Sequence, residues 1–197
     1  MSSEEERLRD FDLTDPKAMR ALAHPARMTL LELLASHETL TATQAAELMG
    51  ETPANCAFHL RTLAKHGFVQ EAGGGRGRER PWRNATRDIN LRRTQSTPQA
   101  AIAAQALGEM FRERSFEHVR RAFAAPLPDA WENHRTATFG NCYVTPDEFD
   151  QLAKDVREVI NRYVDRDEDP AQRPEEAQLV ELVFFGYPDV DQIRDTS

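Results

Sequence analysis

Hydrophobic residues recur at helical spacing in the first third of the chain, between dipeptides that typically begin helices. Asp15-Pro16 predicts a helix start, with Met19 and Leu22 supplying a short apolar face. His24-Pro25 interrupts this helix and begins a second, leucine-rich helix, which is apolar enough to form the core of a domain. His24 has no acidic or cysteine neighbour at metal-ligand spacing, so we expect it to pack at the junction of the two helices.

Two capped helices follow in close succession. Thr41 and Gln44 have the spacing of a capping box and predict a short helix that Gly50 ends. Thr52-Pro53 begins another helix that runs to about His66, because threonine is a good N-cap and proline is tolerated at the first helical position. Its buried stripe is Leu60, Leu63 and Ala64, and its other faces carry Ala54, Asn55, Ala57, Phe58 and Arg61.

A basic hairpin is predicted after these helices, with strands over residues 68–72 and 80–85 and a glycine-rich tip over 73–77. Arginines on such a loop can lie against phosphates or enter a minor groove, because glycines have no side chains that would hold the backbone away from a partner. A solvated hairpin with no partner is the alternative, but only Glu79 interrupts the arginines. Those arginines are Arg76, Arg78, Arg80 and Arg83.

Charge is unevenly distributed along the chain. The net charge is -8, yet residues 52–93 hold nine Lys/Arg against three Asp/Glu, a net of +6. Residues 126–197 hold seven against seventeen, a net of -10. The excess of positive over negative charge is therefore concentrated on the second helix of the capped pair and the hairpin, which favours a nucleic-acid partner there.

A long helix is predicted from Pro98 to about Ala124, and its apolar pattern changes phase. Two opposed apolar faces require two partners, so we expect the first half to pack on a second copy and the second half to anchor the C-terminal region. A helix that covers one core within the chain is the alternative, and it requires a kink over residues 112–115. The first stripe is Ala100, Ala103, Leu107, Met110 and Phe111; the second is Phe116, Val119, Ala122 and Phe123.

The remaining residues predict a small β-α-β unit. Strands are expected over 136–144 and 179–185, on either side of a strongly amphipathic helix that Thr145-Pro146 begins. Two strands are too few for independent stability, so the unit is expected to pack on the long helix or to complete itself across a dimer. Candidate walls of an apolar effector pocket are Trp131, Phe139, Tyr143 and Phe184, although core packing is the commoner role of such residues.

Together, the order of these elements resembles the winged-helix domains of ArsR-type bacterial transcription regulators. Residues 22–27, Leu-Ala-His-Pro-Ala-Arg, are similar to the family's entry motif, and residues 58–69 are similar to its recognition helix and exit. The resemblance implies that Ala54, Asn55, Ala57 and Phe58 face base edges and that His59 lies near the backbone. The family often has serine where Ala57 stands, so contact there is expected to be apolar, for instance with a thymine methyl group.

The expected fold class is therefore α+β. It comprises a winged helix-turn-helix domain over residues 15–90, a long linker and dimerisation helix over 98–124, and the small α/β unit over 126–188. The residues assigned to dimerisation are Ala103, Leu107, Met110 and Phe111. The residues assigned to DNA are Thr43, Gln44, Thr52, Ala54, Asn55, Ala57, Phe58, His59, Arg61, Arg76, Arg78 and Arg80.

Other chemistry has little support in the sequence. Zinc takes about four ligands, whereas residues 47–53 contain no cysteine and residues 95–124 offer His118 beside Glu117, so no metal or cofactor is expected. Cys56 and Cys142 make no disulfide framework, and Cys56 is expected to be a small buried apolar residue, with a redox switch as the alternative. No phosphate-binding glycine motif or nucleophile site is present, so no enzyme is expected. Without a signal peptide or a membrane-spanning run, the expected location is the cytoplasm.

The predicted function is a sequence-specific DNA-binding transcriptional regulator, acting as a dimeric repressor on an inverted-repeat operator. The alternative is a winged helix that binds proteins and has no role with nucleic acid. The sequence leaves open whether a small apolar effector controls it.

Overall fold

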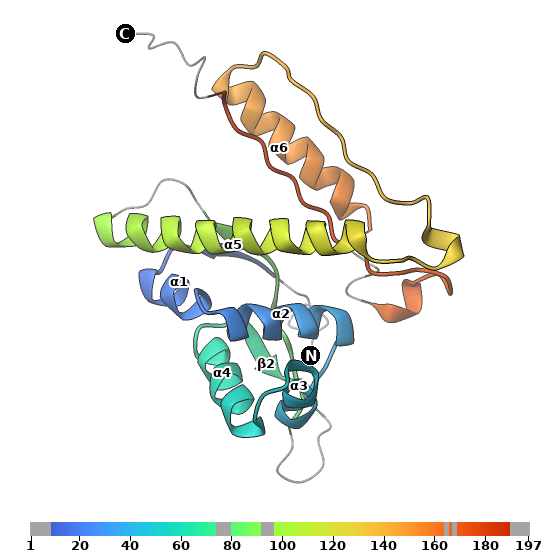
Figure 1. Cartoon of the computed structure of the whole chain (residues 1–197). Helices are drawn as coiled ribbons and strands as arrows, with labels where there is room; N and C mark the ends of the chain where they lie inside the picture. The colour runs from blue at the N-terminus through green and yellow to red at the C-terminus, as the bar shows by residue number, and fades with distance from the viewer. Residues whose placement is uncertain (1–8, 74–79, 92–96, 164–165, 167–168, 190–197) are drawn as a thin grey trace. The chain divides into compact units, whose positions relative to one another are not determined.

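The computed structural model describes residues 9–73, 80–91, 97–163, 166 and 169–189. The chain divides into two compact units, residues 1–120 and 121–197. Figure 1 labels the main elements. Each unit is described by itself.

Four helices of the first unit form where the sequence predicts them: α1 (Pro16–Leu22), α2 (Pro25–His37), α3 (Ala42–Met49) and α4 (Pro53–Lys65). Side chains satisfy the backbone donors that a helix leaves free at its first turn. Asp15 Oδ1 accepts from the Lys17 N–H at 2.9 Å. His24 Nδ1 accepts from the Ala26 N–H at 3.2 Å, so the predicted position of His24 at the junction is confirmed.

The predicted hairpin consists of β2 (Val69–Glu71) and β3 (Trp82–Asn84), which pair antiparallel. Leu40, between α2 and α3, extends this sheet by exchanging backbone hydrogen bonds of 3.0 and 2.8 Å with Trp82. Asn84 Nδ2 donates to the Leu31 carbonyl at 3.2 Å, which ties β3 to α2. Helices α3 and α4 followed by this hairpin give the winged helix-turn-helix fold that the sequence predicts. Residues 74–79 of the tip lie outside the described residues.

A second pair of strands was not foreseen. β1 (Arg9–Leu13) runs parallel to β4 (Thr86–Leu91), with Leu13 opposite Leu91. Neither strand is among the elements that the sequence predicts. Polar and apolar residues alternate over only four residues of each strand, 10–13 and 88–91. Each strand also depends on a partner more than seventy residues away, which local sequence cannot reveal.

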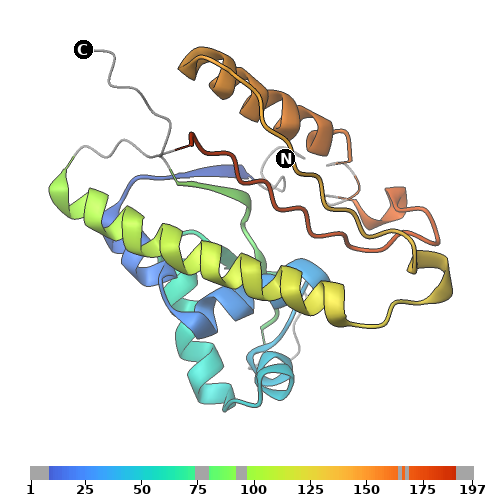
Figure 2. The same cartoon turned by 45° about the horizontal axis from the view of Figure 1, so that its top comes forward.

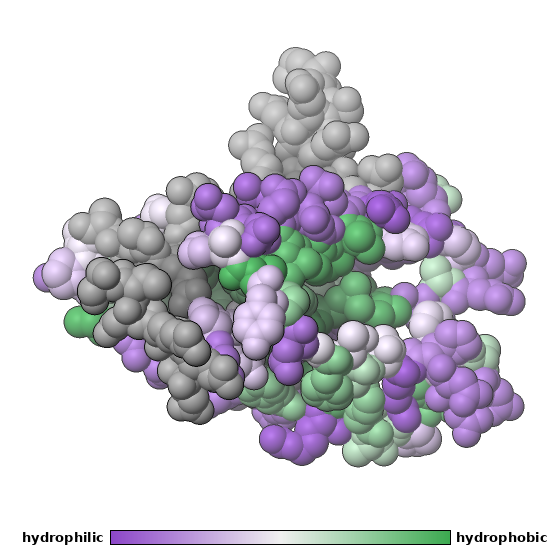
Figure 3. All heavy atoms as spheres, turned by 90° about the horizontal axis from the view of Figure 1, so that it is seen from above, coloured by the Kyte–Doolittle hydropathy of each residue, from purple (hydrophilic) through white to green (hydrophobic). Residues whose placement is uncertain are grey.

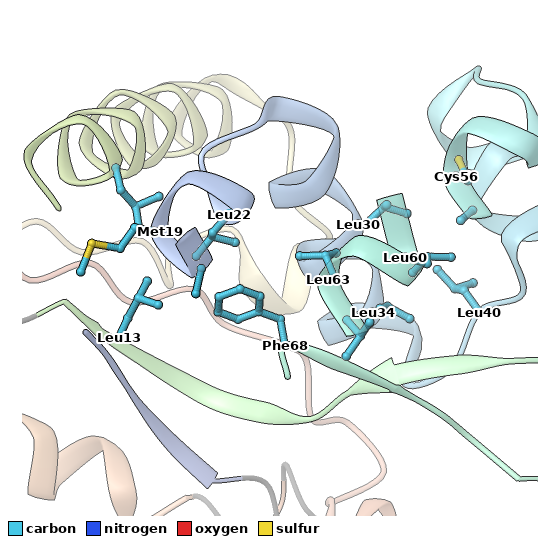
Figure 4. Packing of buried hydrophobic residues seen from close by; sticks show 14 of the residues in the cluster. Leu13, Met19, Leu22, Leu30, Leu34, Leu40, Cys56, Leu60, Leu63 and Phe68 are labelled. Atoms are coloured by element: carbon cyan, nitrogen blue, oxygen red, sulfur yellow. The ribbon is translucent and has the colours of Figure 1, made fainter. Parts of the chain in front are cut away.

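One apolar cluster holds the first unit together. Phe68, at the end of α4, is fully buried and lies among leucines from α1, α2 and α4 (Figure 4). Among the described residues, those classed as buried all lie between Leu13 and Leu107. The core of this part of the chain thus lies within the winged-helix unit.

Helix α5 (Pro98–Ala124) covers this core with one face. Ala103, Ala104 and Leu107 belong to the apolar cluster. Further along, the guanidinium of Arg114 forms a bidentate ion pair with Glu32 and donates to Thr29 Oγ1 at 2.7 Å. This polar contact fixes the middle of α5 on α2, because paired N–H donors on a carboxylate set both distance and direction.

The second unit contains α6 (Pro146–Asn161) and two short 3-10 turns, η1 (Asp129–Trp131) and η2 (Pro170–Gln172). The predicted capping box of α6 is confirmed, since Thr145 Oγ1 accepts from the Glu148 N–H at 3.3 Å. The predicted strands over 136–144 and 179–185 are wrong: both segments lack strand pairing and run as extended chain along α6 (Figures 1 and 2). β-Branched and aromatic composition favours extended backbone, but a strand also needs a hydrogen-bonded neighbour.

Apolar side chains of the second unit remain largely at the surface. Described residues of α6, η1 and η2 include none that is buried, and Leu182 on the last extended segment is 62 % exposed. Figure 3 shows apolar residues reaching the surface on one face of the molecule. Gly186 lies so close to Phe149 that a Cβ there would come within 2.8 Å of the ring.

We predict that Leu13→Ala lowers the free energy of unfolding by about 2–5 kcal/mol, because a fully buried leucine leaves a cavity when truncated. Thr14→Ala, at the exposed neighbouring position, is the control and should change it by less than about 0.5 kcal/mol. Urea unfolding followed by circular dichroism measures both. Equal stabilities would contradict a structured N-terminal strand.

Candidate nucleic-acid interface

The turn between α3 and α4 sets the direction of the second helix. Gly50 has a φ of +67°, the left-handed conformation that favours glycine, and donates its N–H to the Ala46 carbonyl. Thr52 then caps α4 by accepting from the Asn55 N–H at 3.2 Å. Thr41 and Gln44 form the predicted capping box of α3. Three residues thus suffice to separate the two helices of the motif.

Burial of one face of α4 leaves a continuous exposed stripe on the other. Cys56, His59, Leu60 and Leu63 are buried. The exposed positions recur at spacings of four, three and four residues, which is one face of a helix. This stripe, which we call the α4 stripe, is apolar near the start of the helix and basic near its end. It consists of Ala54, Phe58, Arg61 and Lys65.

Residues assigned to DNA fall into four groups in the structure. Thr43, Asn55 and Ala57 are half-buried, and His59 is only 6 % exposed. The expectation that His59 lies against the nucleic-acid backbone is not met, because its ring packs within the domain. Arg76 and Arg78 lie outside the described residues. The exposed group is Gln44, Thr52, Ala54, Phe58, Arg61 and Arg80.

Sequence reasoning missed Glu51. Its Oε2 accepts from Asn55 Nδ2 at 3.0 Å, so the side chain assigned to base recognition is held by a carboxylate one turn earlier. The acid and amide stand four residues apart, a spacing at which side chains meet on a helix surface, and this was the available signal. One of the two N–H donors of Asn55 is therefore already used within the chain.

Acceptors within the hairpin engage two of its arginines. Arg80 Nη1 lies 2.5 Å from Glu71 Oε2, and the two exposed side chains form an ion pair between the strands. Arg83 Nε and Nη2 donate to Gln70 Oε1 at 2.9 and 3.0 Å when the amide faces them. These contacts orient the described part of the hairpin, while Arg76 and Arg78 remain predictions from the sequence.

A histidine pair connects α4 to the start of α2. The rings of His24 and His59 have centroids 4.6 Å apart, and Nδ1 of His59 has no hydrogen-bond partner among the described residues. Burial is the main cause that lowers the pKa of His59, and the positive charges of His24 and Arg27 lower it further, against a smaller opposite effect of Glu51. Burial and Arg27 also lower the pKa of His24. The folded protein therefore favours neutral rings at this junction.

Cys56 is buried on the same helix. Burial, followed by the negative charge of Glu51, raises the pKa of its thiol. A raised pKa disfavours the thiolate, which is the form that reacts with oxidants. The structure thus supports the apolar role of Cys56 over the redox alternative.

The residues assigned to dimerisation lie elsewhere than expected. Ala103 and Leu107 are core residues of their own chain, with exposures of 7 % and 0 %, and Phe111 packs against the same core. Met110 is half-buried. Periodicity correctly predicts that this stripe is buried, but it cannot distinguish burial within one chain from burial against a second copy.

The four residues proposed as walls of an effector pocket form no enclosed site. Tyr143 and Phe139 are fully or almost fully exposed, and Phe184 is half exposed. Trp131 packs edge-on to His134, with ring centroids 5.7 Å apart. The pocket was inferred from a sheet packed on a helix, and without that sheet these side chains have no common cavity.

Other kinds of site have no counterpart in the described part of the chain. No three His, Cys, Asp or Glu side chains there come together as a metal site would require. Of the described helices, none is long and apolar enough to cross a bilayer.

Comparison with known proteins identifies the domain type. Residues 22–71 match the family model of a helix-turn-helix domain. Among curated proteins, none matches this sequence. The match to a helix-turn-helix model and the winged-helix fold support the role of a DNA-binding transcriptional regulator.

Three solved structures are partly similar to this chain. A transcriptional regulator homologue from Pyrococcus horikoshii is 18 % identical over 54 % of this chain and 90 % of its own, with a TM-score of 0.31. Rv0081 of M. tuberculosis is 22 % identical over 50 % and 89 %, with a TM-score of 0.31. A mutant of Lactococcus lactis ZitR is 15 % identical over 72 % and 83 %, with a TM-score of 0.32. Similarity at this level identifies no function.

We predict that acidification destabilises the protein through His59. A lowered folded-state pKa means that the unfolded chain binds the proton more tightly, so the stabilising contribution is complete above the unfolded pKa of about 6.5 and is lost as pH falls below it. The slope contributed by one proton is at most about 1.4 kcal/mol per pH unit. Urea unfolding between pH 5 and 8 measures it.

The matched variants are His59→Phe, which should flatten this slope, and His37→Gln, at an exposed position, which should keep it. An identical slope in wild type and His59→Phe would show that His59 does not couple folding to pH.

Proposed function

We propose that the protein is a dimeric, sequence-specific transcriptional repressor that places α4 of each copy in a major groove. The observation that carries this proposal is the α4 stripe: a helix fixed by a dry core on one side presents an uninterrupted exposed face on the other. Basic residues on that face and on the hairpin supply the attraction for phosphate. The resemblance of residues 22–27 and 58–69 to ArsR-type regulators supports the same role.

The dimer contact is placed on the side of α5 that faces away from the winged-helix core. At about 100° per residue, Ile102, Phe116 and Phe123 fall on the side opposite Leu107. These three side chains are between 49 % and 70 % exposed. A self-complementary apolar face on one long helix suits a twofold axis, because each copy then offers the same surface to the other. Two recognition helices about 34 Å apart would require an inverted-repeat operator.

Binding to nucleic acid is tested by selecting fragments of genomic DNA and measuring mobility shifts across salt concentrations. Enrichment of a symmetric site supports the proposal. If the folded protein binds no DNA at any salt concentration, the alternative of a protein-interaction module is favoured. The observation behind that alternative is the exposure of two apolar side chains, Leu48 and Phe58, on the helix-turn-helix.

We predict that the double variant Arg76→Ala, Arg78→Ala weakens binding to all sequences and reduces the salt slope by about two, since each lost phosphate contact accounts for about 0.9. The double variant Arg157→Ala, Arg162→Ala, at exposed positions on α6 and at its C-cap, is the charge-matched control and should leave both quantities unchanged. Asn55→Ala should change base preference and leave the salt slope intact. Unaltered affinity and preference in all these variants would refute the assignment of these residues.

We predict that Phe116→Glu converts the protein to a monomer, because a charge at the centre of an apolar contact loses its hydration. Ala122 belongs to the same predicted stripe but lies about 120° round the helix from Phe116, outside the proposed contact, so Ala122→Glu adds the same charge and should leave a dimer. Sedimentation equilibrium at micromolar concentration measures the mass. A monomeric wild type would contradict the dimer, and a dimeric Phe116→Glu would place the contact on a different surface.

A further inference from the structure

Phe58 is the large apolar residue of the α4 stripe and is 56 % exposed. In the winged-helix core the comparable side chains are withdrawn from water, with Phe68 fully buried. An exposed aromatic ring at the centre of a helix face that otherwise ends in Arg61 and Lys65 is therefore a candidate contact residue.

The position of this ring is fixed from below. Buried His59 lies edge-on to it, with ring centroids 5.3 Å apart and an interplanar angle of 68°. The Phe58 carbonyl accepts the α4 helical bond and also the hydroxyl of Thr62 at 2.9 Å. Leu60 and Leu63 anchor the opposite side of the helix in the core. The backbone that carries the ring is thus held in place, and the ring has one side against His59, so a partner would need to order little more than the side chain.

Few hydrogen-bond donors accompany Phe58 at the start of α4. Ala54 and Ala57 have no polar side-chain atoms, and one donor of Asn55 is used by Glu51. The apolar group that base edges offer in the major groove is the C5 methyl of thymine, and alanine and phenylalanine are side chains that contact it. The positive charge of Arg61 and Lys65 at the far end of the same stripe fits the phosphates that border that groove.

We propose that Phe58 determines specificity by packing on the methyl group of a thymine in each operator half-site. This inference rests on the proposed function of α4 as a recognition helix. It assigns to the start of that helix an apolar mode of base recognition, in place of the side-chain hydrogen bonds that its amide and hydroxyl residues would otherwise supply.

The test replaces thymine by uracil, one position at a time, in the operator obtained from genomic selection. Uracil pairs like thymine and lacks only the methyl group, so base pairing is preserved. Loss of one buried methyl group should weaken binding about fourfold per half-site at one position and leave the other positions unchanged. 5-Bromouracil, whose bromine takes the place of the methyl group, should restore most of that affinity at the same position.

The substitution Phe58→Ala tests whether the loss of affinity for the uracil operator depends on the phenylalanine ring. This variant should bind the thymine and uracil operators equally, whereas Arg61→Ala should weaken binding to both and keep the fourfold difference. Phe58 is exposed, so unchanged urea unfolding is expected in the variant and is measured first.

Two failures are distinguishable. Sequence-specific binding with no uracil effect at any position, or with an effect that persists in Phe58→Ala, would overturn the role of Phe58 and leave the proposed function intact. Failure of the wild type to bind any selected DNA would overturn the proposed function and this inference with it.

Discussion

Burial of one side of α4 against the leucines of α1 and α2 is the constraint on which the rest of the structure depends. Leu60 and Leu63 are withdrawn into the core with Phe68, which fixes the rotation of α4 about its own axis. The α4 stripe is the consequence, because the side chains of α4 that are not packed in the core face outward. A recognition surface of this kind needs a rigid support, because displacement of about 1 Å is enough to lose a base contact.

Polar groups connect this support to the rest of the chain at two places. The His24–His59 contact joins the start of α2 to α4, and burial lowers the pKa of both rings, which favours their neutral forms. Arg114 joins α5 to α2 through Glu32 and Thr29. A half-buried guanidinium that donates to three oxygens, two of Glu32 and one of Thr29, is specific in direction, whereas apolar contacts alone would let α5 slide. Movement of α5 would therefore act on α2, and α2 is in contact with α4.

The second unit poses a different problem of stability. Its amphipathic helix α6 and its apolar extended segments remain largely exposed, and within the described residues it has no dry core of its own. Apolar burial is the main force available to a small unit, so a unit without a core depends on a covering surface. Residues 126–197 of this unit have a net charge of -10, whereas α4 and the hairpin lie in a segment, residues 52–93, with a net charge of +6. Residues proposed as pocket walls, such as Tyr143, are better understood as part of this uncovered apolar surface.

The sequence by itself determined the helices, because their signals are local: capping residues, proline at the first helical position and periodic leucines act within a few residues. It also placed Ala54, Phe58 and Arg61 on the outward side of α4, but it did not predict the burial of His59. Only the tertiary structure decided the parallel pairing of β1 with β4, the absence of strands around α6, the burial of Leu107 in its own chain and the contact between Glu51 and Asn55. The physical reason is that periodicity specifies that a face is buried, while the identity of what buries it depends on residues distant in sequence.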